Sequence, residues 1–180
     1  MLCVLRRAGR GGRRQKPSRR AGYLILKGTG RSWSGYAIVK GNRISGHGRR
    51  AFQRVLYSWR TGAEHEIDAR LIRLLAQVSD KFGGRPLRIA SGFREKSFAR
   101  ESKHKQGRAC DFSVEGMPNE ALRDYLHTLE GVGVGYYPNS SFVHLDVRAK
   151  TTHWTDHSAP GEGPRRKGPR GKPEDAGTSN

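Results

Sequence analysis

Two segments of the chain carry the residue types that bind a catalytic metal ion. Residues 102–111 read SKHKQGRACD, and residues 142–148 read FVHLDVR. A catalytic zinc ion takes three protein ligands from His, Asp, Glu or Cys and leaves a fourth position open for water. Because His104, Asp111 and His144 lie on two separated segments, the sequence predicts a zinc site that is assembled by folding.

The expected elements can bring these residues together. Residues 108–114 alternate as a strand that places Ala109 and Asp111 on one face, and residues 142–147 form a hairpin with residues 132–137. Asp111 and His144 then point to the same face if their strands are close in an antiparallel sheet. The loop before the first strand carries His104, and Gly107 permits the sharp backbone path that returns this loop over the strand.

The remaining pattern predicts an α+β fold. Asp68 begins a helix that ends at Gly83 and has an apolar face of Leu71, Leu74, Leu75, Val78 and Phe82. Pro118 begins a second helix, with an apolar stripe of Leu122, Tyr125, Leu126 and Leu129. Short strands are expected at residues 23–26, 36–39 and 87–90. We therefore expect a small antiparallel sheet packed with two or more helices.

Composition divides the chain into a core and two tails. Residues 1–20 contain eight Lys or Arg and no acidic residue, and the last twenty residues consist mainly of Pro, Gly and charged residues. Such segments bury too little apolar surface to offset the entropy of an ordered chain. We expect a disordered basic arm at residues 1–21, one domain that carries the candidate zinc ligands at residues 22–158, and a disordered tail at residues 159–180.

The net charge of +19 favours a polyanionic partner, such as nucleic acid, an anionic membrane surface or a bacterial wall. Alternatively, the tails only keep the protein soluble or bind anions without specificity. Cys3 and Cys110 do not indicate a structural disulfide. No segment approaches the roughly 18 apolar residues of a membrane span. The first residues lack the apolar stretch of about 7–15 residues in a secretory signal, so the sequence does not support export.

The combined motifs resemble the M15 metallopeptidase superfamily and are most similar to its murein endopeptidase K branch. The motifs are SxHxxGxAxD at residues 102–111, GVGYYP at 133–138, FVHLD at 142–146 and SGFR at 91–94. The resemblance covers about residues 57–158. It implies the fold shared by D,D-peptidases and the hedgehog signalling domain, with zinc held by His104, Asp111 and His144. It also implies peptidoglycan peptides as the substrate, and hence a location in the periplasm or cell envelope.

The resemblance also implies roles for two further residues. Arg94 matches an arginine that stabilises a developing oxyanion or holds a substrate carboxylate. Several relatives have an acid three residues before the last histidine ligand, where this chain has Ser141. Asp146 is the available substitute as general base; the alternative is that Asp146 orients a ligand histidine. The stretch between Arg94 and His104 is shorter than in the relatives, which leaves substrate specificity open.

The resemblance thus implies a zinc-dependent peptidoglycan peptidase, either a murein endopeptidase or a D,D-carboxypeptidase. Zinc-activated water attacks the amide bond, Arg94 stabilises charge and Asp146 handles protons. The alternative is a non-catalytic zinc-bearing module that binds cell-wall anions or nucleic acid through its basic surface. The basic arm, the absence of a signal sequence and Ser141 favour this alternative. Against it, the sequence has no basic helix with base-contacting side chains and no aromatic pair for base stacking.

Overall fold

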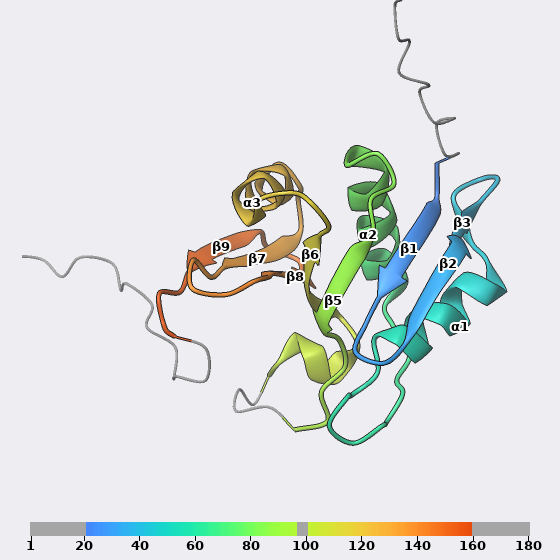
Figure 1. The fold of residues 1–180 in the computed structure, drawn as a ribbon, viewed down its shortest axis with the longest axis horizontal. Coiled ribbons are helices and arrows are strands. Elements are labelled where there is room, and N and C mark those ends of the chain that lie inside the picture. Colours follow the sequence, from blue (N-terminus) through green and yellow to red (C-terminus); the bar gives the residue numbers. More distant parts are fainter. Residues whose placement is uncertain (1–20, 97–100, 160–180) are drawn as a thin grey trace, which may run out of the picture.

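The computed structural model describes residues 21–96 and 101–159. These residues form a seven-stranded sheet in the order β2-β1-β5-β6-β8-β7-β9, a small β3-β4 pair and three α-helices (Figure 1). The strands of the large sheet are β1 (Tyr23–Lys27), β2 (Ser32–Tyr36), β5 (Leu87–Ser91), β6 (Ala109–Val114), β7 (Val132–Tyr136), β8 (Val143–Val147) and β9 (Thr152–Thr155). The small pair is β3 (Ile38–Val39) and β4 (Arg43–Ile44).

The α+β class is confirmed, but the expected small antiparallel sheet is wrong. The sheet is mixed, because β1 pairs with β5 and β7 pairs with β9 in parallel. A parallel pair needs a long crossover connection, and the segment between β1 and β5 provides one that contains two helices. The alternation rule did not predict β9, since three of its four residues are exposed. The relation to the D,D-peptidase and hedgehog fold stays a prediction.

Two helices cover the core face of the sheet. The expected helices are present as α2 (Ala69–Lys81) and α3 (Asn119–His127), and the Asp68 side chain caps α2 by accepting from the Arg70 N–H (2.7 Å). Their buried side chains pack with those of β6 and β8 in one core, which includes Leu71, Leu75, Leu122, Leu126, Cys110, Phe112 and Leu145. Since Cys110 and Phe112 face this core, Ala109 and Asp111 lie on the opposite face of β6, as the sequence predicts.

A third helix, α1 (Gly46–Val55), was not expected from the sequence. Its two glycines lower the helix propensity and only three of its ten residues are apolar, although the Ser45 hydroxyl caps it by accepting from the Gly48 N–H (2.9 Å). Phe52 and Val55 anchor the helix in the core. The carbonyl group of Leu56, which caps the C-terminal end of α1, accepts a hydrogen bond from the Phe93 N–H (2.7 Å). The helix therefore holds the segment that leads from β5 to Arg94.

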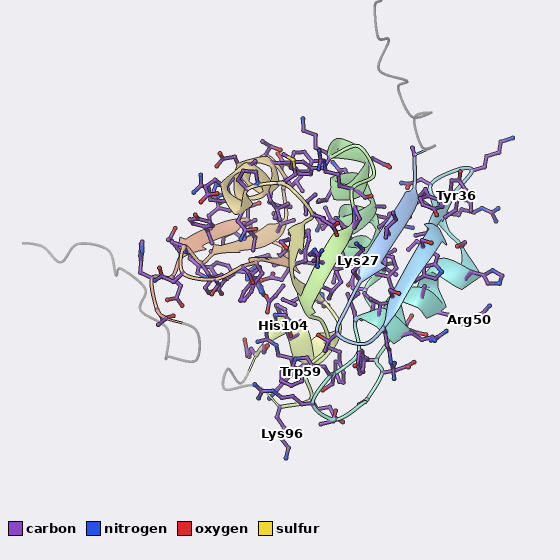
Figure 2. The ribbon with its side chains drawn as sticks, in the orientation of Figure 1. Lys27, Tyr36, Arg50, Trp59, Lys96 and His104 are labelled. Atoms are coloured by element: carbon purple, nitrogen blue, oxygen red, sulfur yellow. The ribbon has the colours of Figure 1, made fainter. Side chains whose placement is uncertain are left out.

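The predicted arm and tail fall almost entirely outside the described residues, so the domain limits stay a prediction. Within residues 21–96 and 101–159, no helix has both the length and the apolar character needed to cross a membrane. In Figure 2, Tyr36 is labelled at the upper right of the molecule, whereas His104, Trp59 and Lys96 are labelled along its lower edge.

Candidate metal centre

The strands β6 and β8 place Asp111 and His144 side by side. The two strands are antiparallel, and Asp111 stands directly opposite His144 in the register. In the same way, Ala109 stands opposite Asp146. Because side chains alternate along a strand, Asp111, His144 and Asp146 all project from the face that the helices leave uncovered. This is the juxtaposition that the sequence predicts.

A short 3-10 helix, η1 (Lys103–Gln106), carries the third residue, His104. It ends at Gly107, whose φ of 62° lies in the left-handed region. A Cβ at Gly107 would overlap the carbonyl oxygen of Glu66, and the Gly107 carbonyl accepts from the Asp68 N–H (3.0 Å). Residue 107 is therefore glycine for two reasons: its conformation and the close approach of the chain before α2.

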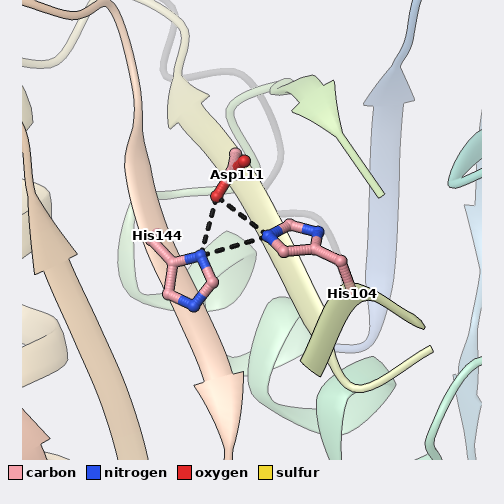
Figure 3. A group of neighbouring side chains, drawn as sticks. All are labelled: His104, Asp111 and His144. Carbon is pink, nitrogen blue, oxygen red and sulfur yellow. Dashed lines mark hydrogen bonds and ion pairs between the residues drawn. The ribbon is translucent and has the colours of Figure 1, made fainter. Parts of the chain in front are cut away.

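His104, Asp111 and His144 converge on one point (Figure 3). The Nδ1 atom of His144 lies 2.8 Å from Oδ1 of Asp111 and 3.2 Å from Nε2 of His104. Nε2 of His104 lies 3.4 Å from the same Oδ1. Ligand atoms of a tetrahedral zinc ion lie about 3.3 Å apart when the bonds are ~2.0–2.1 Å. The three atoms therefore have the spacing of three corners of such a site, and all three residues are buried.

The outer hydrogen bonds of the two histidines decide which nitrogen faces this point. Nδ1 of His104 lies 2.6 Å from the carbonyl oxygen of Gly92, which can only accept, so Nδ1 carries the proton. Nε2 of His144 likewise donates to Oδ2 of Asp146 (3.0 Å). In the neutral rings, the inward nitrogens then present lone pairs to each other and to Oδ1 of Asp111. Three acceptors at these distances repel each other unless a cation lies between them.

The electrostatics of the centre follow from burial and from these contacts. Burial favours the neutral form of Asp111, but the charge and hydrogen bond of His104, together with His144, hold the pKa of Asp111 well below its usual range. For His144, burial opposes the charged ring, but the hydrogen bonds to Asp111 and Asp146 raise its pKa above 6.5. A proton held on Nδ1 of His144 would satisfy the same lone pairs in place of a metal ion. Binding of a metal ion would release that proton.

Asp146 is buried and has partners for both of its oxygens. Nε of Arg148 donates to Oδ1 (2.7 Å), while Nη2 of Arg148 and Nε2 of His144 donate to Oδ2. Burial opposes its charge, but the hydrogen bonds from His144 and Arg148 lower the pKa of Asp146 from 3.8 to about 2. These contacts favour the role of orienting His144 over that of general base, two roles that the sequence left open. Ser141 is exposed.

Arg94 contacts the centre from the segment after β5. Its Nη2 donates to Oδ2 of Asp111, and its Nε donates to Oγ of Ser91 (2.7 Å). The Arg94 side chain is 40% exposed, so part of the guanidinium still faces solvent. The sequence singled out Arg94 but assigned no role to Ser91 or to the Gly92 carbonyl. Their only signal was membership of the SGFR motif, and the Gly92 contact involves the backbone, which residue types do not reveal.

A cavity of about 770 Å³ lies apart from this centre. It is formed where β2, β3 and α2 meet, and Tyr36, Ile38, Arg73 and Asp80 are among its lining residues. None of His104, Asp111 and His144 lines it, and Tyr36 lies well apart from His104 (Figure 2). The cavity therefore does not supply a substrate pocket for the three converging side chains.

Comparisons with known proteins agree with the motifs. The family model Peptidase_M15_2, described as peptidoglycan L,D-endopeptidase MepK, matches residues 24–154. Peptidoglycan L,D-endopeptidase MepK of Escherichia coli (strain K12) is 32% identical over 108 residues, which cover 53% of this chain and 59% of that protein. The probable peptidoglycan L,D-endopeptidase MepK of Haemophilus influenzae is 30% identical over 101 residues, covering 49% of this chain and 54% of that protein. The match thus spans little more than half of each curated relative. No solved structure matches the chain.

Proposed function

The chain belongs to the M15 peptidase family of peptidoglycan L,D-endopeptidase MepK, and on that premise we propose that it is a zinc-dependent peptidoglycan endopeptidase. The observation that supports this most is the convergence of His104 Nε2, Asp111 Oδ1 and His144 Nδ1, three buried atoms that lie 2.8–3.4 Å apart, as metal ligands do. We choose endopeptidase over D,D-carboxypeptidase because both curated relatives carry that name. Its place of action is then the periplasm or cell envelope, where peptidoglycan lies.

The three donor atoms suit zinc and would leave its fourth coordination position open for water. His104, Asp111 and His144 supply two neutral nitrogens and one carboxylate oxygen, a set typical of catalytic zinc sites with three protein ligands. A zinc ion held there supplies a Lewis acid that lowers the pKa of water and polarises the scissile carbonyl. The carbonyl of Gly92 and the carboxylate of Asp146 fix the ring planes, so that the inward nitrogens keep their direction.

Arg94 has two tasks in this proposal. Its bond to Oδ2 of Asp111 leaves Oδ1 as the single ligand oxygen of that carboxylate. The exposed part of its guanidinium faces the solvent side, where a substrate carbonyl or carboxylate would arrive. A planar, permanently charged group in that place stabilises negative charge that develops on the carbonyl oxygen.

The proposal is tested by incubating the purified chain with muropeptides and identifying the products by mass spectrometry. We expect cleavage that a chelator abolishes and that added zinc restores. His104→Ala and Asp111→Ala should lose zinc and cleavage together, because each removes one of three ligands. The same assay separates the alternative of a non-catalytic zinc module: no product under any metal, together with salt-sensitive binding to wall fragments or nucleic acid, would reject the enzyme.

A further inference from the structure

We propose that Arg148 is a positioning residue of the metal centre, which acts through Asp146, and that Gly133 is glycine so that the Arg148 guanidinium can lie over it. The inference rests on the proposed function only as far as His104, Asp111 and His144 are the metal ligands. Neither Arg148 nor Gly133 supplies a ligand atom, but loss of the contact between Arg148 and Asp146 is expected to weaken metal binding.

The contacts form a continuous line from Arg148 to the ligand atoms. Nε of Arg148 donates to Oδ1 of Asp146 (2.7 Å), and Nη2 donates to Oδ2. The same Oδ2 accepts from Nε2 of His144 (3.0 Å), whose other nitrogen faces Asp111. Two bonds from a planar guanidinium fix the plane of a carboxylate, which a single bond does not. The direction in which Asp146 accepts from His144 is therefore set by Arg148.

The strand β7 leaves space for this arrangement at two glycines. In the register of β7 with β8, Gly133 stands opposite Asp146 and Gly135 stands opposite His144. A Cβ at Gly133 would overlap the guanidinium of Arg148, and a Cβ at Gly135 would come within 2.6 Å of the Trp154 indole. Both side chains thus lie flat over β7, on the face that carries the metal centre.

Trp154 packs beside both His144 and Arg148. Its ring centroid lies 5.3 Å from that of His144, and the Arg148 Cζ lies 5.5 Å from the Trp154 ring centroid. Only 1% of the Asp146 side chain is exposed, so its charge is compensated by Arg148 rather than by bulk water. Loss of the guanidinium would leave Asp146 with one partner, free to turn or to take up a proton. In either case His144 loses its fixed acceptor.

Gly133→Ala offers a way to test the role of Arg148 without changing Arg148. The new methyl group meets the far end of a flexible side chain rather than backbone, so the guanidinium can swing away while the strand keeps its place. We expect Gly133→Ala and Arg148→Met each to weaken zinc binding about 10–100-fold, the usual effect of removing a partner of a ligand. The double variant should bind zinc no more weakly than Arg148→Met alone, because both changes break the same contact.

The measurement is the zinc dissociation constant, obtained by competition with a chromophoric chelator, for the wild type, both single variants and the double variant. The absorption spectrum of the cobalt-substituted proteins gives a second readout, since it reports ligand geometry directly. Arg148→Lys should recover part of the affinity, because an ammonium group replaces the charge but makes one bond in place of two. Melting temperatures of the metal-free proteins separate a loss of fold from a loss of metal affinity.

Two control variants make the same kinds of change away from the metal centre: one replaces an arginine by methionine and the other replaces a glycine by alanine. Arg88 forms an ion pair with Glu115 on the surface (3.1 Å), so Arg88→Met removes a comparable pair away from the centre. A Cβ at Gly46 meets nothing within 4 Å, so Gly46→Ala adds a methyl group without a clash. Both controls should bind zinc as the wild type does.

Wild-type affinity in Arg148→Met, or additive losses in the double variant, would overturn the inference. Because zinc binding is measured without substrate, a protein that binds zinc but cleaves no muropeptide would reject the proposed function alone.

Discussion

The two candidate ligand histidines differ in the group that orients them. A backbone carbonyl, that of Gly92, fixes His104, whereas a buried carboxylate, that of Asp146, fixes His144. A carboxylate partner makes the ring more basic and a stronger ligand than a carbonyl partner does. The two histidines are therefore unequal, and the one on β8 depends on a charge that must itself be compensated by Arg148.

The variant Asp146→Asn distinguishes between two roles of Asp146: orienting His144 and acting as the general base. If Asp146 orients His144, we expect zinc affinity to fall about 10–100-fold, while turnover at saturating zinc falls much less. If Asp146 is the general base, zinc affinity stays near that of the wild type and kcat falls by about 10²–10⁴. Zinc titration and steady-state kinetics on the same preparation decide between these outcomes. Asp124→Asn, in an exposed pair with Arg123, is a suitable control.

The low pKa of Asp146 also predicts an acid-dependent loss of stability. Its pKa is about 2 in the folded chain, below the ordinary value of 3.8, so its ionised form stabilises the fold at pH values above about 4. That contribution is lost as pH falls from about 4 to 2. In metal-free protein, the free energy of unfolding should therefore decline less steeply over this range in Asp146→Asn than in the wild type. Urea titrations at several pH values measure this difference; parallel profiles would contradict it.

At the scale of elements, β6, β8 and η1 form the centre, and Gly107 joins two of them. The chain before α2 packs closely against Gly107: the carbonyl oxygen of Glu66 lies where a Cβ of residue 107 would be. A rigid connection of this kind gives His104 its position relative to Asp111.

Gly107→Ala should therefore affect both stability and metal binding. The residue combines a φ of 62° with a clash against backbone, whereas Gly83 has a φ of 68° and open space around its Cβ position. Gly83→Ala should cost about 1 kcal/mol for the strained φ alone, at the lower end of the usual range. Gly107→Ala should cost clearly more and weaken zinc binding, which Gly83→Ala should not. Chemical denaturation and zinc titration of the two variants test this; equal losses of stability would show that the clash has no effect.

The elements that the sequence predicts well are those with strong periodicity. The apolar faces of α2 and α3 and the alternation of β6 were sufficient to place Asp111 and His144 on one face. The helix α1 and the edge strand β9 were not expected, because α1 has two glycines and few apolar residues and β9 is mostly exposed. The ligand types could be predicted from spacing, but the contacts around Asp146 could not. They depend on how Arg148 folds over Gly133, a packing relation between two strands.

At the scale of the whole molecule, the buried centre and the surface charge act over different distances. The candidate ligands and Asp146 are almost fully removed from solvent, whereas the Lys and Arg side chains of the described residues are at least partly exposed. Dissolved salt screens exposed charges strongly and buried pairs much less. If the proposed function holds, we expect the net charge of +19 to contribute to encounter with an anionic wall rather than to the hydrolytic step.

Salt should accordingly separate wall binding from catalysis. The screening length falls from about 10 Å at 0.1 M to about 3 Å at 1 M ionic strength, so attraction between the basic surface and anionic peptidoglycan weakens over that range. We expect cosedimentation of the zinc-free chain with intact sacculi to decrease steeply with added salt. Cleavage of a short, uncharged soluble peptide by the zinc-loaded enzyme should change little, because the buried contacts among His144, Asp146 and Arg148 are screened only weakly. If cosedimentation with sacculi and cleavage of the peptide were equally sensitive to salt, surface charge would also support the chemical step. That result would contradict the expectation.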